Sequence, residues 1–182
     1  MNLPTLTREE LIAKWGDTIH KTFDIFTWTS PGELAWLCEM AAQVDSIVEV
    51  GSYHGKSAKC MSLANPKADI TCIDLPQDER CWEILSVNLR GSGVQIFRGN
   101  TGDWLRSLRP GGFKFAFIDG GHLEVDVTAD IQNILPHMAP GAILAGHDWR
   151  HNNPLDGINV AVEKAFDKHR IRVFESIWHI QL

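Results

Sequence analysis

One short segment of the sequence combines an acidic residue, glycines and hydroxyl side chains in a way that suits a ligand site. The run over 48–57, VEVGSYHGKS, continues a stretch rich in β-branched residues that predicts a strand, and Gly51 ends this strand. A helix is expected to start near Gly55. Glycines in such a turn let a ligand approach the backbone closely, and the N-terminus of a helix favours negative charge. The segment therefore predicts a site for a nucleotide-like ligand.

Three ligand classes compete for this turn. The residues over 55–57, GKS, are those that end a phosphate-binding P-loop, but only three residues separate Gly51 from Gly55 where that motif needs four. The apolar run over 113–119 ends in an aspartate that could serve magnesium, which keeps this alternative open. Asp74 lies 23 residues after Gly51, near the distance at which a carboxylate binds the ribose of a dinucleotide, although the G-x-G-x-x-G spacing is absent. The third class is S-adenosylmethionine, which carries no phosphate.

Apolar periodicity places this turn within a series of alternating strands and helices. Capping-box patterns at Thr7 and Ser30 predict two N-terminal helices. Apolar runs predict strands over 46–50, 68–73, 94–97, 113–118 and 142–145, and helical patterns follow over 55–64, 78–90, 101–108 and 155–168. A further helix presents Val127, Ile131, Ile134, Leu135 and Met138 on one face, with Pro136 expected to kink or shorten it. Residues 171–182 are expected to form two strands with a bend near 175–176.

This alternation predicts the fold class. We expect an α/β, Rossmann-like, doubly wound, mostly parallel sheet with helices on both faces and a C-terminal antiparallel strand pair. The chain is expected to be a single domain over 1–182, with a core over 45–182 and N-terminal helices over 1–44 that contribute to the substrate side. Ligands of such sheets lie beyond the carboxyl ends of the strands, and the turn over 51–55 lies at that edge.

Composition narrows the partners. The chain has 182 residues, 44% of them hydrophobic and 22% charged, with a formal net charge of -6 and no block of Lys or Arg. Nucleic-acid and membrane partners are therefore not expected. The four cysteines form no CxxC pair, which disfavours a zinc or redox site. The N-terminus lacks a signal-peptide pattern and no apolar run approaches a membrane span, so a cytoplasmic location is expected.

Five motifs, in order along the chain, resemble those of the class I S-adenosylmethionine-dependent methyltransferases. They are EVGSYHG over 49–55, Asp74 after the second strand, GNT over 99–101, FIDGGH over 117–122, and PGA over 140–142 leading to GHD over 146–148. The chain is most similar to a compact group with a GHD motif after the fifth strand, which includes sugar and antibiotic O-methyltransferases. The resemblance covers residues 30–182 and implies a methyltransferase.

The resemblance also implies which residues bind S-adenosyl-L-methionine. Carboxylates suit the ammonium group and the ribose hydroxyls of this cofactor. Asp74 is implied to accept hydrogen bonds from the ribose, Glu49 to face the amino-acid end directly or through water, and Asn100 to lie near the adenine, where an amide both donates and accepts. The implied cofactor-binding set is Glu49, Gly51, Ser52, Tyr53, Gly55, Ser57, Asp74, Asn100, Thr101 and Asp119.

The resemblance further implies a catalytic centre. In the family's strand order the fourth and fifth strands are neighbours, about 4.8 Å apart, which brings Asp119 beside His147 and Asp148. Converging carboxylates can bind a divalent cation such as Mg²⁺, which would lower the pKa of a substrate hydroxyl and orient it. We expect Asp119 and Asp148 as metal ligands, with His147 as a further candidate. Asp119 and His122 are the expected catalytic residues, His122 as general base because imidazole titrates near neutral pH.

The acceptor is the least defined feature of the sequence. We expect a small hydroxylated molecule, such as a sugar or a natural product, because the loop over 149–156 is rich in polar groups. The acceptor pocket is expected to come from the N-terminal helices, from this loop, or from a second subunit of a homo-oligomer. Two other functions stay open: a non-catalytic protein that binds S-adenosylmethionine or a nucleotide, and a P-loop-like phosphotransferase.

Overall fold

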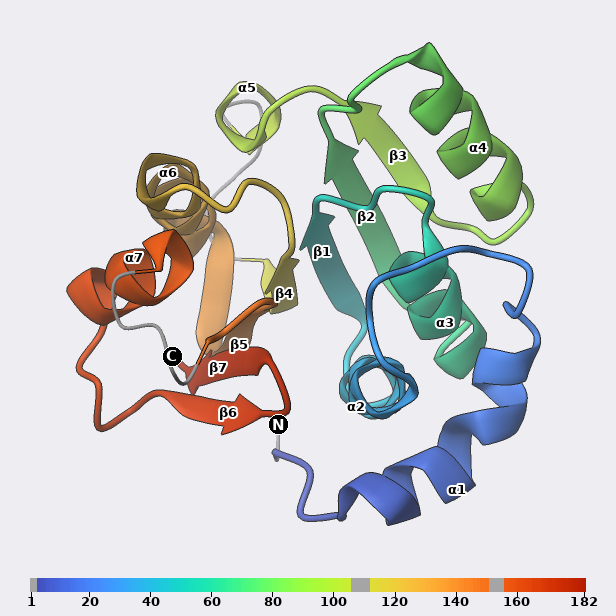
Figure 1. Cartoon of the computed structure of the whole chain (residues 1–182), viewed down its shortest axis with the longest axis horizontal. Coiled ribbons are helices and arrows are strands. Elements are labelled where there is room, and N and C mark those ends of the chain that lie inside the picture. Colours follow the sequence, from blue (N-terminus) through green and yellow to red (C-terminus); the bar gives the residue numbers. More distant parts are fainter. Residues whose placement is uncertain (1–2, 106–111, 151–155) are drawn as a thin grey trace.

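A single mostly parallel sheet runs through the protein (Figure 1). The computed structural model describes residues 3–105, 112–150 and 156–182. Within these residues the strands are β1 (Ser46–Val50), β2 (Asp69–Asp74), β3 (Gln95–Arg98), β4 (Phe113–Ile118), β5 (Met138–Gly146), β6 (Arg172–Phe174) and β7 (Ile177–Gln181). Their order is β3-β2-β1-β4-β5-β7-β6, and only the pairings of β7 with β5 and β6 are antiparallel. The expected Rossmann-like fold class is confirmed.

Helices cover both faces of the sheet. They are α1 (Arg8–His20), α2 (Pro31–Ala41), α3 (Lys56–Ala64), α4 (Glu79–Leu89), α5 (Thr101–Leu105), α6 (Glu124–Ile134) and α7 (Gly157–Ala165). Figure 1 shows α2, α3 and α4 on one side of the sheet, with α1 outside α2, and α5, α6 and α7 on the other side. None of these helices combines the length and apolarity needed to cross a bilayer.

The two N-terminal helices start where the sequence predicts. Thr7 and Ser30 each accept a hydrogen bond from the backbone three residues on, and Glu10 and Glu33 return the bond to the cap residue's own N–H. Each capping box satisfies donors that the first turn of a helix leaves unpaired. Pro31 fits at the first position of α2 because a backbone N–H at this position would have no acceptor within the helix.

The alternation of side chains along β1 divides the core into two layers. Val48 and Val50 belong to the layer beneath α6 and α7, whereas Ile47 packs with the side chains of α2. Glu49 points to the same side of the sheet as Ile47, because successive residues of a strand face opposite sides. A carboxylate is thereby placed inside the protein, with no exposed surface.

The end of α6 differs from the sequence prediction. The expected helical face runs to Met138, but α6 ends at Ile134, and Pro136 lies in a 3₁₀ turn over Leu135–His137. Met138 is the first residue of β5 and pairs with Phe113 before a register shift. Proline lacks the N–H that would continue the helix, so the chain turns into the strand earlier.

Other boundaries agree with the sequence prediction to within a few residues. The bend near 175–176 separates β6 from β7, as expected. Residues 106–111, which include the predicted end of the helix over 101–108, lie outside the described residues. So does the 151–155 part of the loop over 149–156, together with the predicted first residue of the helix over 155–168.

Candidate active site

A cleft of about 1060 Å³ lies along the carboxyl ends of the parallel strands. Its lining combines the turns after β1, β2, β3, β4 and β5 with part of the segment between α1 and α2. This is the edge at which open α/β sheets bind ligands, and the volume is that of a small-molecule site. The lining includes most of the residues singled out from the sequence: Gly51, Ser52, Tyr53, Ser57, Asp74, Asn100, Thr101, Asp119, His122, His147 and Asp148.

The turn after β1 has little room for side chains. Gly51 has a φ of +80°, and a Cβ there would lie 2.2 Å from the carbonyl oxygen of Asp119. Gly55, the residue that caps α3, also has a positive φ, and a Cβ at this position would lie 2.9 Å from the side chain of Leu85 on α4. Glycine tolerates both the backbone conformation and the close contacts, as the sequence predicts for a turn that approaches a ligand.

Asp74 holds this turn through its backbone. Its Oδ2 accepts hydrogen bonds from the N–H groups of Ser52, at 2.6 Å, and Tyr53, at 2.8 Å. A P-loop needs such N–H groups for phosphate, so the turn is poorly suited to bind a triphosphate. Burial raises the pKa of Asp74. Its Oδ1 makes no hydrogen bond within the described residues and belongs to a side chain that lines the cleft.

Glu49 is a buried carboxyl group that has no counter-ion among the described residues. Its Oε2 accepts hydrogen bonds from the Ser52 hydroxyl, at 2.5 Å, and from the Cys72 thiol, at 3.3 Å, and Ser57 also bonds to the carboxylate. Its Oε1 is buried and has no partner in the described part of the chain. Burial, with a smaller contribution from the negative charge of Asp119, raises the pKa of Glu49 to about 7.

The two polar residues after β3 have structural partners. Asn100 accepts a hydrogen bond from the N–H of Asp103, at 2.9 Å, and so caps α5. The Thr101 hydroxyl donates to Asp130 on α6, at 2.7 Å, and its side chain is buried. Both residues line the cleft, but Thr101 offers less of its side chain to a ligand than the sequence suggests.

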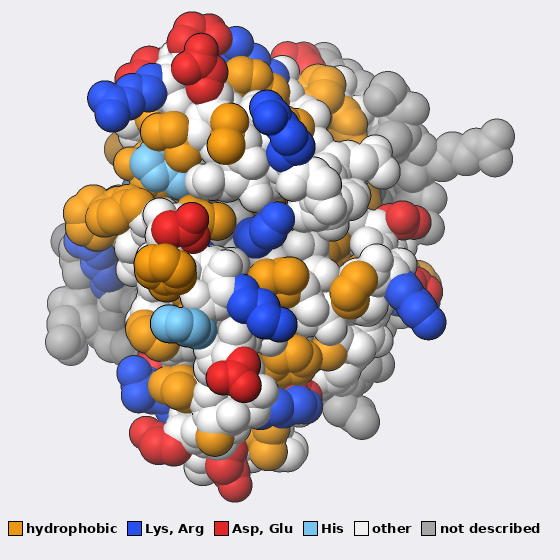
Figure 2. All heavy atoms as spheres, turned by 90° about the vertical axis from the view of Figure 1, so that its right-hand side faces the viewer, with side chains coloured by type: hydrophobic (Ala, Val, Ile, Leu, Met, Phe, Trp, Pro, Cys, Tyr) orange, Lys and Arg blue, Asp and Glu red, His pale blue; other side chains and the backbone are white. Residues whose placement is uncertain are grey.

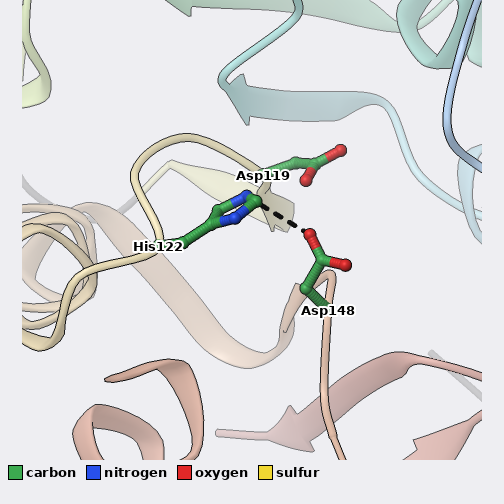
Figure 3. A group of neighbouring side chains, drawn as sticks. All are labelled: Asp119, His122 and Asp148. Carbon is green, nitrogen blue, oxygen red and sulfur yellow. Dashed lines mark ion pairs between the residues drawn. The ribbon is translucent and has the colours of Figure 1, made fainter. Parts of the chain in front are cut away.

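Asp119, His122 and Asp148 form an open cluster at the ends of β4 and β5 (Figure 3). One ligand atom from each lies within 4.8 Å of the others, and His122 Nε2 lies 3.2 Å from Asp148 Oδ2. Burial raises the pKa of Asp119, whereas hydrogen bonding to His147 holds the pKa of Asp148 below its usual range. This donor set of two carboxylates and an imidazole suits a divalent cation.

His147 borders the cleft, but its side chain is largely buried behind this cluster. Its Nδ1 lies 3.5 Å from Asp119 Oδ1 and 3.4 Å from Asp148 Oδ2, and its Nε2 lies 3.2 Å from Glu33 Oε2. Burial acts to lower the pKa of His147, but hydrogen bonds to the three carboxylates outweigh it and raise the pKa to about 12. A charged imidazole cannot bind a metal, so the geometry favours His122 over His147 as the nitrogen of the cluster.

Glu33 is a residue of the site that the sequence indicates only as a helix cap. Its side chain is buried beneath the carboxyl ends of the strands, and Ser176 donates to its Oε1 from both the backbone N–H, at 3.1 Å, and the hydroxyl. Burial acts to raise the pKa of Glu33, but hydrogen bonds from His147, Ser176 and Ser30 lower it to about 2. No local pattern could reveal these partners, because Ser176 lies 143 residues away.

The segment between α1 and α2 adds an aromatic rim to the cleft. Phe26 makes edge contacts with Trp28, Tyr53 and His54, at centroid distances of 5.0 to 6.2 Å, and Tyr53 stacks on His54 at 3.8 Å. Trp28 is 83% exposed although it lines the cleft. Figure 2 shows that hydrophobic side chains lie exposed among charged ones on the side of the molecule seen at the right of Figure 1.

Comparison with known proteins identifies related sequences and structures. Residues 48–149, more than half of the chain, match a family described as Methyltransferase domain. No curated protein sequence matches significantly. An O-methyltransferase from Bacillus cereus in complex with SAH is 14% identical, with 98% of this chain and 93% of that chain covered and a TM-score of 0.67.

Two further structures are similar over most of their length. TomG of Streptomyces achromogenes, an O-methyltransferase involved in tomaymycin synthesis and solved with SAM, is 17% identical, with 97% of this chain and 92% of that chain covered and a TM-score of 0.66. CalS11, a TDP-rhamnose 3'-O-methyltransferase of calicheamicin biosynthesis, is 17% identical, with 98% and 88% covered and a TM-score of 0.63. At such identities the likeness establishes the fold.

The buried carboxyl of Glu49 predicts how the ligand-free protein responds to pH. In the folded state the carboxyl group of Glu49 binds its proton more tightly than in the unfolded chain, where glutamate has a pKa near 4.5. The contribution of Glu49 to stability is therefore lost as the pH rises from about 4.5 to about 7. We expect Glu49→Gln to gain about 3 kcal/mol in unfolding free energy relative to wild type across this interval, measured by urea denaturation.

The control is Glu163→Gln, which changes an exposed glutamate of α7. Its stability should follow the wild-type pH profile. Parallel profiles of wild type and Glu49→Gln would show that Glu49 keeps an ordinary pKa in the folded protein.

Proposed function

The chain belongs to the methyltransferase domain family and is a class I methyltransferase, and from this premise we propose that it transfers the methyl group of S-adenosylmethionine to a hydroxyl oxygen of a small acceptor. One observation carries the proposal. The cleft is lined by an open acid-base cluster of Asp119, His122 and Asp148. Glu49 is buried behind the lining residue Ser52, which bonds to it, and has no counter-ion among the described residues. Glu49 suits a cationic cofactor and the cluster suits a hydroxyl that must lose its proton.

Glu49 and Asp74 are the groups that we assign to the cofactor. The ammonium group of S-adenosylmethionine would supply the positive charge that Glu49 lacks, directly or through a water molecule. Asp74 uses Oδ2 to hold the turn and has Oδ1 for a ribose hydroxyl. The glycine at position 51 lets the backbone after β1 lie close to the backbone of Asp119 after β4, which leaves no room for a side chain at this point.

His122 is the group that we assign as the general base. Its Nε2 faces Asp148, so this nitrogen carries a hydrogen and Nδ1 accepts the proton of the acceptor hydroxyl. The hydroxyl oxygen forms a bond to the methyl carbon while the bond from carbon to sulfur breaks, and the electron pair stays on sulfur in S-adenosylhomocysteine. The His122 side chain is 56% exposed and can pass the proton to solvent.

A divalent cation fits the same cluster. Asp119 and Asp148 would hold the ion, because hard cations such as Mg²⁺ and Mn²⁺ prefer carboxylate oxygens. When bound, the cation lowers the pKa of a hydroxyl and orients it. The negative charge of the two carboxylates, partly exposed at the cleft, favours such an ion over an anionic group of the substrate.

The aromatic rim, formed by Phe26, Trp28, Tyr53 and His54, supports an acceptor with a flat ring. Sugar and aromatic rings both present an apolar face that packs against an exposed tryptophan. We propose such a ring, with a hydroxyl that reaches Asp119 and Asp148. The TDP-rhamnose 3'-O-methyltransferase and the tomaymycin enzyme act in pathways that make natural products, which is in line with an acceptor of this class.

Calorimetric titration with S-adenosylmethionine and S-adenosylhomocysteine tests the proposed cofactor. We expect saturable binding of both, and binding at least tenfold weaker in Asp74→Asn because a neutral amide accepts hydrogen bonds less strongly than a carboxylate. ATP and NAD are the controls. Binding of ATP without binding of either sulfur ligand would return the turn over 51–55 to the phosphate-binding alternatives. Cofactor binding without turnover of any hydroxylated acceptor would favour a non-catalytic binding protein.

Mn²⁺ titration tests the proposed metal site. Wild type is expected to bind one Mn²⁺, and Asp148→Asn should weaken this binding at least tenfold because one anionic ligand becomes neutral. Asp24→Asn, at an exposed position between α1 and α2, is the control and should bind as wild type does. Methyl transfer that persists in EDTA, in a protein without measurable Mn²⁺ affinity, would exclude the metal.

The aromatic rim predicts a change in acceptor binding. Trp28→Ala should raise the KM for the acceptor about fivefold, since the loss of aromatic packing is worth on the order of 1 kcal/mol, and should leave cofactor affinity unchanged. Phe23→Ala removes an exposed aromatic side chain of the same segment that does not line the cleft. Equal effects of both substitutions on KM would argue against a specific contact between Trp28 and the acceptor.

A further inference from the structure

Glu33 is buried more deeply than its role as a helix cap requires. Glu10 occupies the same position in the capping box of α1 and makes the same bond to its cap residue, yet it is exposed. Glu33 is only 4% exposed. Burying a carboxylate costs several kcal/mol unless it is paired and hydrogen-bonded, so a second function must account for its place.

The partners of Glu33 connect α2 to the catalytic cluster. Glu33 Oε2 lies 3.2 Å from His147 Nε2, and the Ser176 hydroxyl lies 3.2 Å from the same nitrogen. The other ring nitrogen of His147 lies between Asp119 and Asp148, at 3.5 and 3.4 Å. Both edges of the imidazole are thus engaged, and a rotation of the ring would break contacts at both.

We propose that Glu33 is a positioning residue: it fixes the His147 imidazole, which in turn holds the Asp119 and Asp148 carboxylates at the spacing that binds a divalent cation. The inference rests on the proposed metal-assisted function. The two carboxylates come from different strands, β4 and β5, and repel each other. The Nδ1–H group of His147 is shared by both carboxylates, and Glu33 holds the opposite edge of the ring. This arrangement keeps both carboxylates directed toward the cleft.

The structure gives this arrangement three supports besides Glu33. The His147 backbone N–H donates to the carbonyl of Ile118, at 3.0 Å, which ties the two strand ends together. Trp149 N–H donates to the carbonyl of Ser176, at 2.9 Å, and so fixes the loop after β5 against the turn before β7. The Phe117 ring contacts the imidazole edge-on, at a centroid distance of 6.4 Å. Among the described residues, Glu33 is the charged partner of the His147 ring that comes from a helix, whereas Asp119 and Asp148 follow strands of the sheet.

Glu33→Gln separates the two roles of the residue. Glutamine also completes a capping box, so α2 should still start at Ser30. We expect unchanged circular dichroism and cofactor affinity within twofold of wild type, but about tenfold weaker Mn²⁺ binding. In ¹⁵N-histidine-labelled protein, the Nε2–H resonance of His147 should lose its protection from solvent exchange. Glu10→Gln, the same change in the capping box of α1, should alter neither readout.

Ser176→Ala provides a second route if Glu33→Gln does not fold. It removes a hydroxyl that contacts both Glu33 and His147 while both charges stay in place, and Mn²⁺ affinity should fall by a smaller factor. Mn²⁺ affinity that drops in Asp148→Asn but is unchanged in Glu33→Gln and Ser176→Ala would overturn the role of Glu33 and leave the proposed function intact. Wild-type protein without Mn²⁺ affinity would overturn the role of Glu33 together with the proposed metal site, whereas the proposed methyl transfer would still be decided by cofactor binding and turnover.

Discussion

The buried imidazolium of His147 is the interaction on which the arrangement of the site depends. It lies within 3.5 Å of carboxylate oxygens of Glu33, Asp119 and Asp148, which reach it from α2, β4 and β5. Removing charges from water costs several kcal/mol unless they are paired and hydrogen-bonded in this way. The N-terminus of α2 and the ends of two strands must therefore meet at one point, and Ser176 brings the turn before β7 to the same place.

Backbone hydrogen bonds between strand ends complete this constraint. Gly51 N–H donates to the carbonyl of Ile73 and Asp119 N–H donates to the carbonyl of Val50, so each turn begins against the end of a neighbouring strand in the sheet. A glycine is needed at position 51 because the backbone after β4 passes where a Cβ would lie. These contacts fix how the strand ends lie relative to one another, which suits a reaction whose groups must be aligned.

The two sides of the cleft differ in how they are built. On the proposed cofactor side, Glu49 has no positive partner among the described residues, and its burial lowers stability at neutral pH, a loss that a cationic ligand can offset. On the proposed acceptor side, the aromatic rim is contributed by the segment between α1 and α2, and Trp28 is exposed. Specificity can change on that side without disturbing the charged core of the site.

The sequence alone determined the features that depend on neighbours in the chain. The caps at Thr7 and Ser30, the alternation along β1 and the order of strands and helices follow from local hydrogen bonding and periodicity. Only the tertiary structure decided that His147 faces inward, that Glu33 pairs with it and that the aromatic rim borders the cleft. These contacts join residues far apart in sequence, so they depend on strand order, register and twist, which no local pattern encodes.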